Sequence, residues 1–337
     1  MPFELSEEQE LIRRTARAFA DKALQPATEA MDREARFPAE VQRGLAELGF
    51  WGLLAPAEVG GAGVDLTSFA VALEELARRS GSAAAILLAH NLAARAVPDA
   101  ALATGEALAT WQLARGPLAG SWSGGEALEG TARLFPLAGR ARVAVLEHPA
   151  GGLAVLAADD AGQAWVREGT MGLRGAELGQ LVLRGARPRR VAGQGSAAEQ
   201  VGLAAIAVGL GQAAVEEGVR FARDRVQFGQ SIAAFEGVRA RLADMATGID
   251  AGRALLLQAS ALADRGEGAE RLAAEAKVAA TEAASQSTRW CVKLHGGAGF
   301  LKDFAAERLH RDARMLPLLG SDSAALRDAA GRALVGR

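Results

Sequence analysis

Apolar residues recur with helical spacing along the first part of the chain, up to about residue 110. Ser6 and Gln9 form a capping-box pattern at the start of the first such stretch. Asp65 is placed to cap a later helix, and a strongly apolar helix is expected from about Ser82 to Val97. The spacing therefore predicts an all-helical first part.

The pattern changes near residue 116, and from about 130 to 190 short apolar runs are separated by Gly, Pro and Asp. The runs at 142–146, 153–156, 164–166 and 180–183 have the length of strands. We expect a small β-domain in the middle of the chain.

Long alanine- and leucine-rich helical patterns return from Ala197 to the end. The sequence thus predicts a mainly α protein with a small β-domain. Its expected parts are an N-terminal helical domain over 1–115, a β-domain over 116–192 and a C-terminal domain of the four-helix-bundle type over 193–337.

Composition narrows the choice of partners. The 337 residues are 50% hydrophobic and 23% charged, with a net charge of −2, which favours neither nucleic acid nor an anionic membrane as a partner. No apolar run approaches the roughly 20 residues of a membrane span. Cys291 is the single cysteine, and the four histidines lack metal-ligand spacing, so we expect a cytoplasmic protein with no metal site.

Two C-terminal segments carry the strongest functional signal. The first runs Arg225-Val-Gln-Phe-Gly-Gln-Ser-Ile232, and the second runs Leu294-His-Gly-Gly-Ala-Gly-Phe300, followed by the Arg-Asp-Ala-Arg run at 311–314. Together they resemble the acyl-CoA dehydrogenase family. The resemblance covers nearly the whole chain and implies an N-terminal helical domain, a middle β-domain and a C-terminal helical bundle that holds FAD across a subunit interface.

The resemblance places Arg225, Gln227 and Phe228 at the cofactor, with Arg225 on the pyrophosphate of the neighbouring subunit. A guanidinium suits that role because its planar fork matches phosphate oxygens. The alternative reading of Arg225 is a surface arginine at a helix end. Gly296 and Gly297 would bring backbone amides close to the cofactor, and their alternative is a turn between helices.

The chain departs from the family at several of these places. Lys293 and Asp322 stand where the family has Gln and Thr near FAD or the dimer contact, and both are kept as candidate cofactor residues; Asp322 is also a good cap for the last helix. The usual Thr-Glu-Pro loop is missing near 116–130, so the β-domain is abbreviated. The usual catalytic glutamate is replaced by Gly320.

One branch of the family places its catalytic glutamate at the start of the helix that precedes the Arg225 segment. Counted back through the apolar-Gly-Leu-x-Gln run at 208–212, that position is Glu199. A carboxyl group shielded from water can remove a proton α to a thioester. Glu199 also ends the capping-box pattern Ser196-Ala-Ala-Glu199, so a purely structural cap stays open as the alternative.

The resemblance thus implies FAD-dependent α,β-dehydrogenation of an acyl-CoA thioester. Electron-transfer flavoprotein is the implied acceptor, and a homodimer or homotetramer the implied assembly. The alternative is a degenerate or half-site subunit that pairs with a paralogous chain, and a flavin oxidase on the same fold is a weaker one. The length of the acyl chain does not follow from the sequence.

Overall fold

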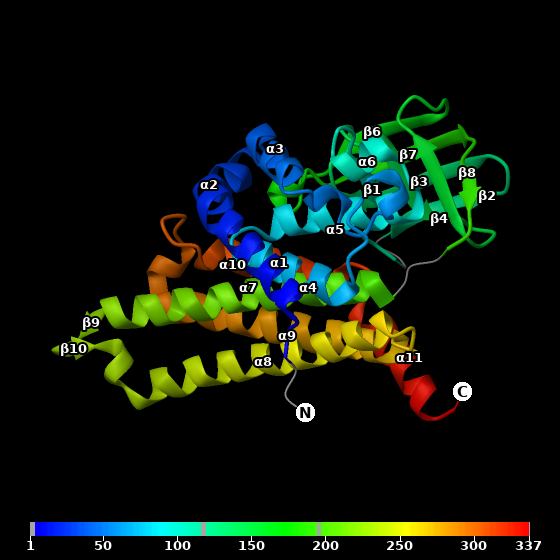
Figure 1. Ribbon diagram of the computed structural model, residues 1–337. Helices are drawn as coiled ribbons and strands as arrows, with labels where there is room; N and C mark the ends of the chain where they lie inside the picture. Colours follow the sequence, from blue (N-terminus) through cyan, green and yellow to red (C-terminus); the bar gives the residue numbers. More distant parts are fainter. Residues whose placement is uncertain (1–3, 116–118, 194–196, 337) are drawn as a thin grey trace.

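The computed structural model describes residues 4–115, 119–193 and 197–336, with helices at both ends of the chain around a β-domain (Figure 1). The N-terminal helices are α1 (Glu7–Phe19), α2 (Gln25–Glu34), α3 (Ala39–Glu47), α4 (Leu66–Ala77), α5 (Gly81–Ala96) and α6 (Ala100–Thr104). The mainly α fold class and the N-terminal helices are as the sequence predicts.

Two helix starts confirm the capping expected from the sequence. The Ser6 hydroxyl accepts from the Gln9 amide while the Gln9 side chain accepts from the Ser6 amide, which closes the capping box of α1. Asp65 accepts from the Ser68 amide at the start of α4. Both caps satisfy backbone donors that the first turn of a helix leaves without partners.

The β-domain consists of two four-stranded sheets. The strands are β1 (Ala109–Trp111), β2 (Gly120–Gly124), β3 (Leu128–Phe135), β4 (Val143–Glu147), β5 (Leu153–Ala157), β6 (Gln163–Arg167), β7 (Gly179–Ala186) and β8 (Arg189–Val191). One sheet has the order β1-β4-β5-β8 and the other β2-β3-β7-β6. All four predicted runs are strands, namely β4 to β7.

Strand β1 ties the β-domain to the helices. It pairs in parallel with β4, so that Trp111 lies opposite Val145. The chain leaves this strand toward Arg115, the last described residue before 116–118. The predicted boundary at 115/116 adjoins that gap, and the boundary at 192/193 lies next to residues 194–196, which are also outside the described residues. Both boundaries stay predictions.

The C-terminal bundle is built on three long helices that run side by side (Figure 1). They are α7 (Ala197–Asp224), α8 (Glu236–Asp264) and α9 (Glu270–His295), and they are followed by α10 (Ala306–Met315) and α11 (Ser323–Leu334). A two-stranded ribbon, β9 (Val226–Gln227) with β10 (Gln230–Ser231), lies at the end of the bundle opposite α11 (Figure 1).

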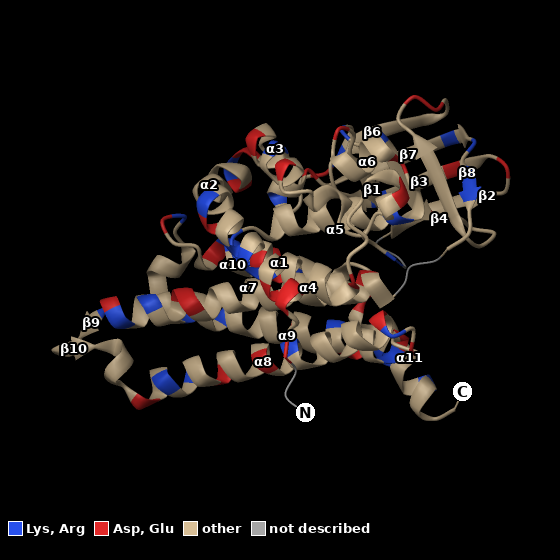
Figure 2. Cartoon of the chain, viewed as in Figure 1, with Lys and Arg blue, Asp and Glu red and all other residues tan. Residues whose placement is uncertain are grey.

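Helix α7 is the central element because glycines let its neighbours approach closely. A Cβ on Gly209 would lie 2.3 Å from the carbonyl oxygen of Glu74 on α4, and one on Gly211 would lie 2.0 Å from Cδ1 of Ile249 on α8. By length and composition α7 could cross a membrane, but 83% of its most apolar window is buried, as in a core helix. Charges of both signs lie interspersed along α7 and α8 (Figure 2).

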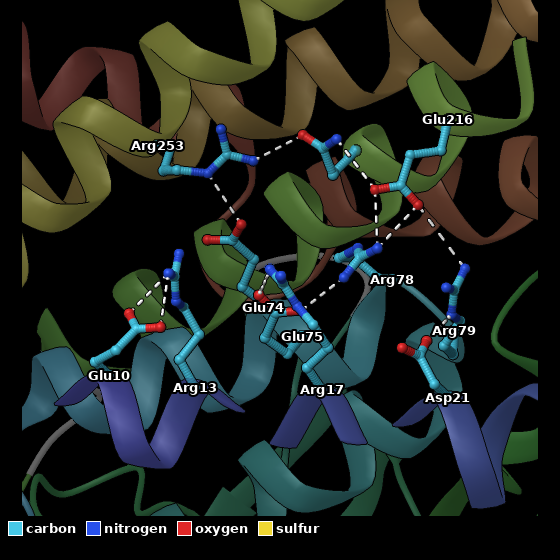
Figure 3. Close-up of polar contacts among 11 residues, drawn as sticks. Glu10, Arg13, Arg17, Asp21, Glu74, Glu75, Arg78, Arg79, Glu216 and Arg253 are labelled. Carbon is cyan, nitrogen blue, oxygen red and sulfur yellow. Dashed lines mark hydrogen bonds and ion pairs between the residues drawn. The ribbon is translucent and has the colours of Figure 1, made fainter. Parts of the chain in front are cut away.

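A network of ion pairs joins α1, α4, α7 and α8 (Figure 3). Glu75 binds Arg17 at 2.6 Å and Arg78 at 2.8 Å. Arg78 continues to Glu216 at 2.9 Å, and Glu74 accepts from Arg253 at 2.9 Å. Burial raises the pKa of Glu74, since Arg253 only partly offsets the loss of water around the carboxylate.

Candidate active site

Glu199 lies in the first turn of α7 and is 1% exposed. Its two carboxylate oxygens accept from two different donors. The indole Nε1 of Trp111 donates to Oε1 at 3.1 Å, and Nη2 of Arg115 donates to Oε2 at 3.2 Å. The structure therefore buries the predicted base between α7 and the end of β1.

The charge state of Glu199 reflects opposed influences. Burial raises the pKa of its carboxyl group, the guanidinium of Arg115 and the bond from Trp111 lower it, and the carboxylate of Glu147 raises it. Burial has the largest influence, so the pKa of Glu199 is raised overall. A general base that works near neutral pH requires a shift in this direction. The alternative role of Glu199, in a capping box with Ser196, involves a residue outside the described ranges and stays a prediction.

Arg115 binds Glu199 on one side and Glu147 on the other. Its Nε lies 3.0 Å from Oε1 of Glu147, and its Nη1 donates to the carbonyls of Gln112 and Ala114 at 2.6 and 2.8 Å. The side chain is 12% exposed. It also lines an open cavity of about 410 Å³ with Ala119, Gly120, Ser121, Trp122, Glu147, His148 and Pro149.

Gly320 lies against the same site, in a crowded position with a left-handed backbone. Its amide donates to the carbonyl of Leu113 at 2.9 Å, and its φ is +63°. A Cβ there would lie 2.7 Å from Cδ1 of Leu203 and 3.2 Å from Nε2 of Gln200. At the position where the family usually has its catalytic glutamate, a side chain would thus meet a left-handed backbone and two side chains that would have to move.

Lys277 on α9 holds the segment around Gly320. It is fully buried, and its Nζ donates to the carbonyls of Pro317 and Ser321 at 3.0 Å each. Burial lowers the pKa of Lys277 to about 8, although the carboxylates of Asp322 and Glu199 oppose that change. Asp322 caps α11 by accepting from the amides of Ala324 and Ala325.

Arg225, Gln227 and Phe228 lie together at the β9–β10 end of the bundle, and all three are exposed. Phe228 has a φ of +53° and is 91% exposed, with an edge-to-face contact to Phe235. Among the described residues, Arg225 forms no ion pair. An exposed guanidinium beside an exposed aromatic ring can bind a ligand or a partner that this chain alone does not supply.

Gly296, Gly297 and Lys293 end α9, the helix that carries Lys277. Side chains at Gly296 and Gly297 would meet nothing within 4 Å, so their backbone lies open to an approaching group. The ammonium of Lys293 lies 4.5 Å from the ring centroid of Trp290. All three residues are exposed at this end of the bundle.

The candidate residues therefore fall into two groups. Lys277, which lies near Glu199, and Lys293 are both on α9. With a helix rise of about 1.5 Å per residue, these two lysines are about 24 Å apart along the helix. Asp322 belongs to the group with Glu199, whereas Arg225 and the other cofactor candidates lie at the far end. The structure does not bring the predicted base and the predicted phosphate contact together within one chain.

Sequence reasoning did not find Trp111, Arg115, Glu147 or Lys277. One signal was available: Lys277 interrupts a stripe of small apolar residues on α9, where a charge requires a specific partner. Arg115 had no such signal, because it lies 84 positions from Glu199 along the chain. In residues 4–115, 119–193 and 197–336, no cluster of three His, Cys, Asp or Glu side chains suits a metal ion.

Residues 6–106 match the acyl-CoA dehydrogenase N-terminal domain, and residues 189–335 match the acyl-CoA dehydrogenase C-terminal domain. The chain is 30% identical to the probable acyl-CoA dehydrogenase YngJ of Bacillus subtilis (strain 168), over 94% of this chain and 95% of that protein. It is 31% identical to the acryloyl-CoA reductase (NADH) of Anaerotignum propionicum, over 94% and 91% of the two proteins. The chain belongs to the acyl-CoA dehydrogenase family.

Solved structures agree with this assignment at the level of the fold. The butyryl-CoA dehydrogenase of Megasphaera elsdenii superposes with a TM-score of 0.88 at 24% identity, over 99% of this chain and 100% of that one. A glutaryl-CoA dehydrogenase from Mycobacterium smegmatis in complex with FADH2 gives 0.88 at 19% identity, over 99% and 96%. FAD is the cofactor of the family.

The residues of this chain fit that cofactor in a divided arrangement. Arg225 offers a guanidinium for phosphate oxygens, and the open turn at Gly296 and Gly297 offers a close backbone approach. Both lie far from Glu199. One chain therefore does not bring these residues and Glu199 together.

Proposed function

We propose that this protein catalyses the FAD-dependent α,β-dehydrogenation of an acyl-CoA thioester, with Glu199 as the base. The observation that carries the proposal is the buried carboxyl group of Glu199, whose pKa burial raises. In its ionised form, a carboxylate shielded from water with a raised pKa can take a proton from the carbon α to a thioester.

In the proposed reaction the chain's own residues bind, orient and move the proton. Glu199 receives the α-proton on its carboxylate, and Trp111 fixes the orientation of the acceptor by donating to Oε1. Arg225, Gln227 and Phe228 would help to hold FAD, which would supply the hydride acceptor for the β-hydrogen. The cavity lined by Arg115 and Trp122 is the proposed entry for the reacting thioester, because it adjoins the guanidinium that holds Glu199.

We further propose a homodimer in which the β9–β10 end of one subunit completes the site of the other. The exposure of Phe228 and Arg225 and the distance along α9 both support this assembly. An electron-transfer flavoprotein is the proposed acceptor of the electrons, and the cytoplasm the proposed location.

The proposal is tested with the protein purified without added cofactor. Its visible spectrum should show flavin, and acyl-CoA esters should bleach it. Glu199→Gln should lower turnover by about 10²–10⁴-fold while the flavin stays bound, whereas Arg225→Ala should reduce the flavin content. Full turnover in Glu199→Gln would show that Glu199 is a structural residue.

A second function is a half-site or non-catalytic subunit that pairs with a paralogous chain. Two observations favour this second function: the carboxylate of Glu199 is already paired with Arg115, and the position of Gly320 is crowded. The flavin measurement separates the two: a chain that stays colourless after incubation with FAD is not a flavoenzyme by itself.

A further inference from the structure

The guanidinium of Arg115 lies between two carboxylates of different exposure. The Glu199 side chain is 1% exposed and the Glu147 side chain 41% exposed. Arg115 itself is nearly buried and uses Nε, Nη1 and Nη2 in polar contacts. It is therefore held in place and is not a mobile surface side chain.

We propose that Arg115 is a positioning residue for Glu199: its guanidinium keeps the buried carboxylate ionised and directed toward the end of β1, and Glu147 weakens that hold by sharing the same cation. The catalytic meaning of this inference rests on the proposed role of Glu199. The charge state of Glu199 does not depend on that role and can be measured directly.

The physical argument begins with burial. A carboxylate removed from water is strongly disfavoured unless a cation and hydrogen-bond donors replace the water. Trp111 supplies one neutral donor, so Arg115 is the cation in direct contact with Glu199. Removal of Arg115 would leave a buried carboxylate with one indole donor, and such a group binds a proton instead.

Four groups face Glu199 from the surrounding elements. They are Trp111 on β1, Arg115 beyond it, Glu147 at the end of β4 and Lys277 on α9. The ammonium of Lys277 acts from farther away, because its hydrogen bonds go to backbone carbonyls beside Gly320. Arg115 and Lys277 thus favour the ionised form, whereas Glu147 opposes it.

This arrangement predicts changes of opposite sign. Arg115→Gln should move the titration of Glu199 to higher pH, because the paired cation is gone. Glu147→Gln should move it to lower pH, because a competing negative charge is removed and Arg115 serves Glu199 alone. A purely structural role for Arg115 would not produce opposite shifts at one carboxyl group.

The experiment is an infrared titration of the full-length protein as purified. The carbonyl band of a protonated buried carboxyl group is assigned to Glu199 by its loss in Glu199→Gln. We expect the midpoint of that band to rise in Arg115→Gln, to fall in Glu147→Gln, and to stay close to wild type in Arg115→Lys, which keeps the charge. Arg133→Gln, which removes another β-domain arginine paired with Glu168, is the matched control.

An unchanged midpoint in both Arg115→Gln and Glu147→Gln would overturn the inference. If Arg115→Gln does not fold, Glu147→Gln alone tests the inference. A midpoint in Glu147→Gln that does not fall below the wild-type value would then refute it. When turnover is present, Arg115→Gln should lower it at neutral pH by at least about tenfold and recover it at higher pH. Shifts as expected together with full turnover in Glu199→Gln would keep this inference and reject Glu199 as the base.

Discussion

Gly320 combines a left-handed backbone with a crowded position. A non-glycine residue at its φ of +63° is strained, and a Cβ there would press on Leu203 and Gln200. Position 320 is therefore less suited to a long side chain than position 199, which carries the proposed base, although both positions adjoin the end of β1.

Replacement of Gly320 by Glu should not restore a Glu199→Gln enzyme. We expect turnover to stay at the level of the single variant and the free energy of unfolding to fall by about 1–3 kcal/mol, from strain and overpacking together. Urea unfolding and initial rates measure the two effects. Gly320→Ala separates backbone strain from the added bulk, and recovery of activity in the double variant would show that the segment at 316–322 relaxes easily.

Single residues were predictable where their partners are close in the chain. Asp322 is the cap of α11 that its position before Ser323 indicated. Glu199 was located by spacing alone, but its ion pair with Arg115 was not, because that contact depends on how β1 docks against α7. Local chemistry follows from neighbouring residues, whereas a buried charge pair follows from tertiary packing.

At the scale of elements, helix starts and strand runs were predictable and their pairing was not. The run at 142–146 indicated a strand, but its parallel partner, the three-residue β1, is too short to show a periodic pattern. Successive pairs of strands also alternate between the two sheets: β2 and β3 lie in one sheet, β4 and β5 in the other, and β6 and β7 in the first again. The sequence therefore indicated a small β-domain without its two-sheet order.

The ion-pair network between α4 and α8 should make stability depend on pH. Arg253→Met removes the guanidinium that binds Glu74, which should lower the free energy of unfolding by about 3 kcal/mol at neutral pH. The loss should shrink as the pH falls toward 4.5, the ordinary value for the group, because the folded-state pKa of Glu74 is raised and a protonated carboxyl group no longer requires the cation.

Urea unfolding at several pH values tests this expectation. Arg265→Met, which removes an exposed pair with Glu267 at the end of the same helix, should change stability little at any pH. A destabilisation by Arg253→Met that is equal at neutral and acid pH would show that its packing matters more than its charge.

At the scale of the whole molecule, the proposed site is divided between the two ends of the bundle. The group around Glu199 lies near α11, and the group around Phe228 lies at the β9–β10 end (Figure 1). The periodic pattern of apolar residues in the sequence does not reveal this division. The distance between the two groups depends on the length of α9 and on how the helices pack around it.

Phe228→Asp should convert the proposed dimer into a monomer with less bound flavin. The ring is 91% exposed, so its loss should leave the unfolding of the monomer nearly unchanged. Light scattering after size exclusion and the flavin spectrum measure both outcomes. Leu334→Asp is the control, because Leu334 is 71% exposed at the other end of the bundle. A dimer that survives Phe228→Asp with full flavin would place the interface elsewhere.

The closed surroundings of Gly320 also bear on how this sequence can change over generations. A glutamate at 320 requires the ends of the Gln200 and Leu203 side chains to move and a non-glycine residue to adopt a left-handed backbone. Both changes cost stability, and neither brings a benefit by itself. With the proposed base at 199, a lineage that inherits this packing therefore gains nothing from a first step back to a glutamate at 320.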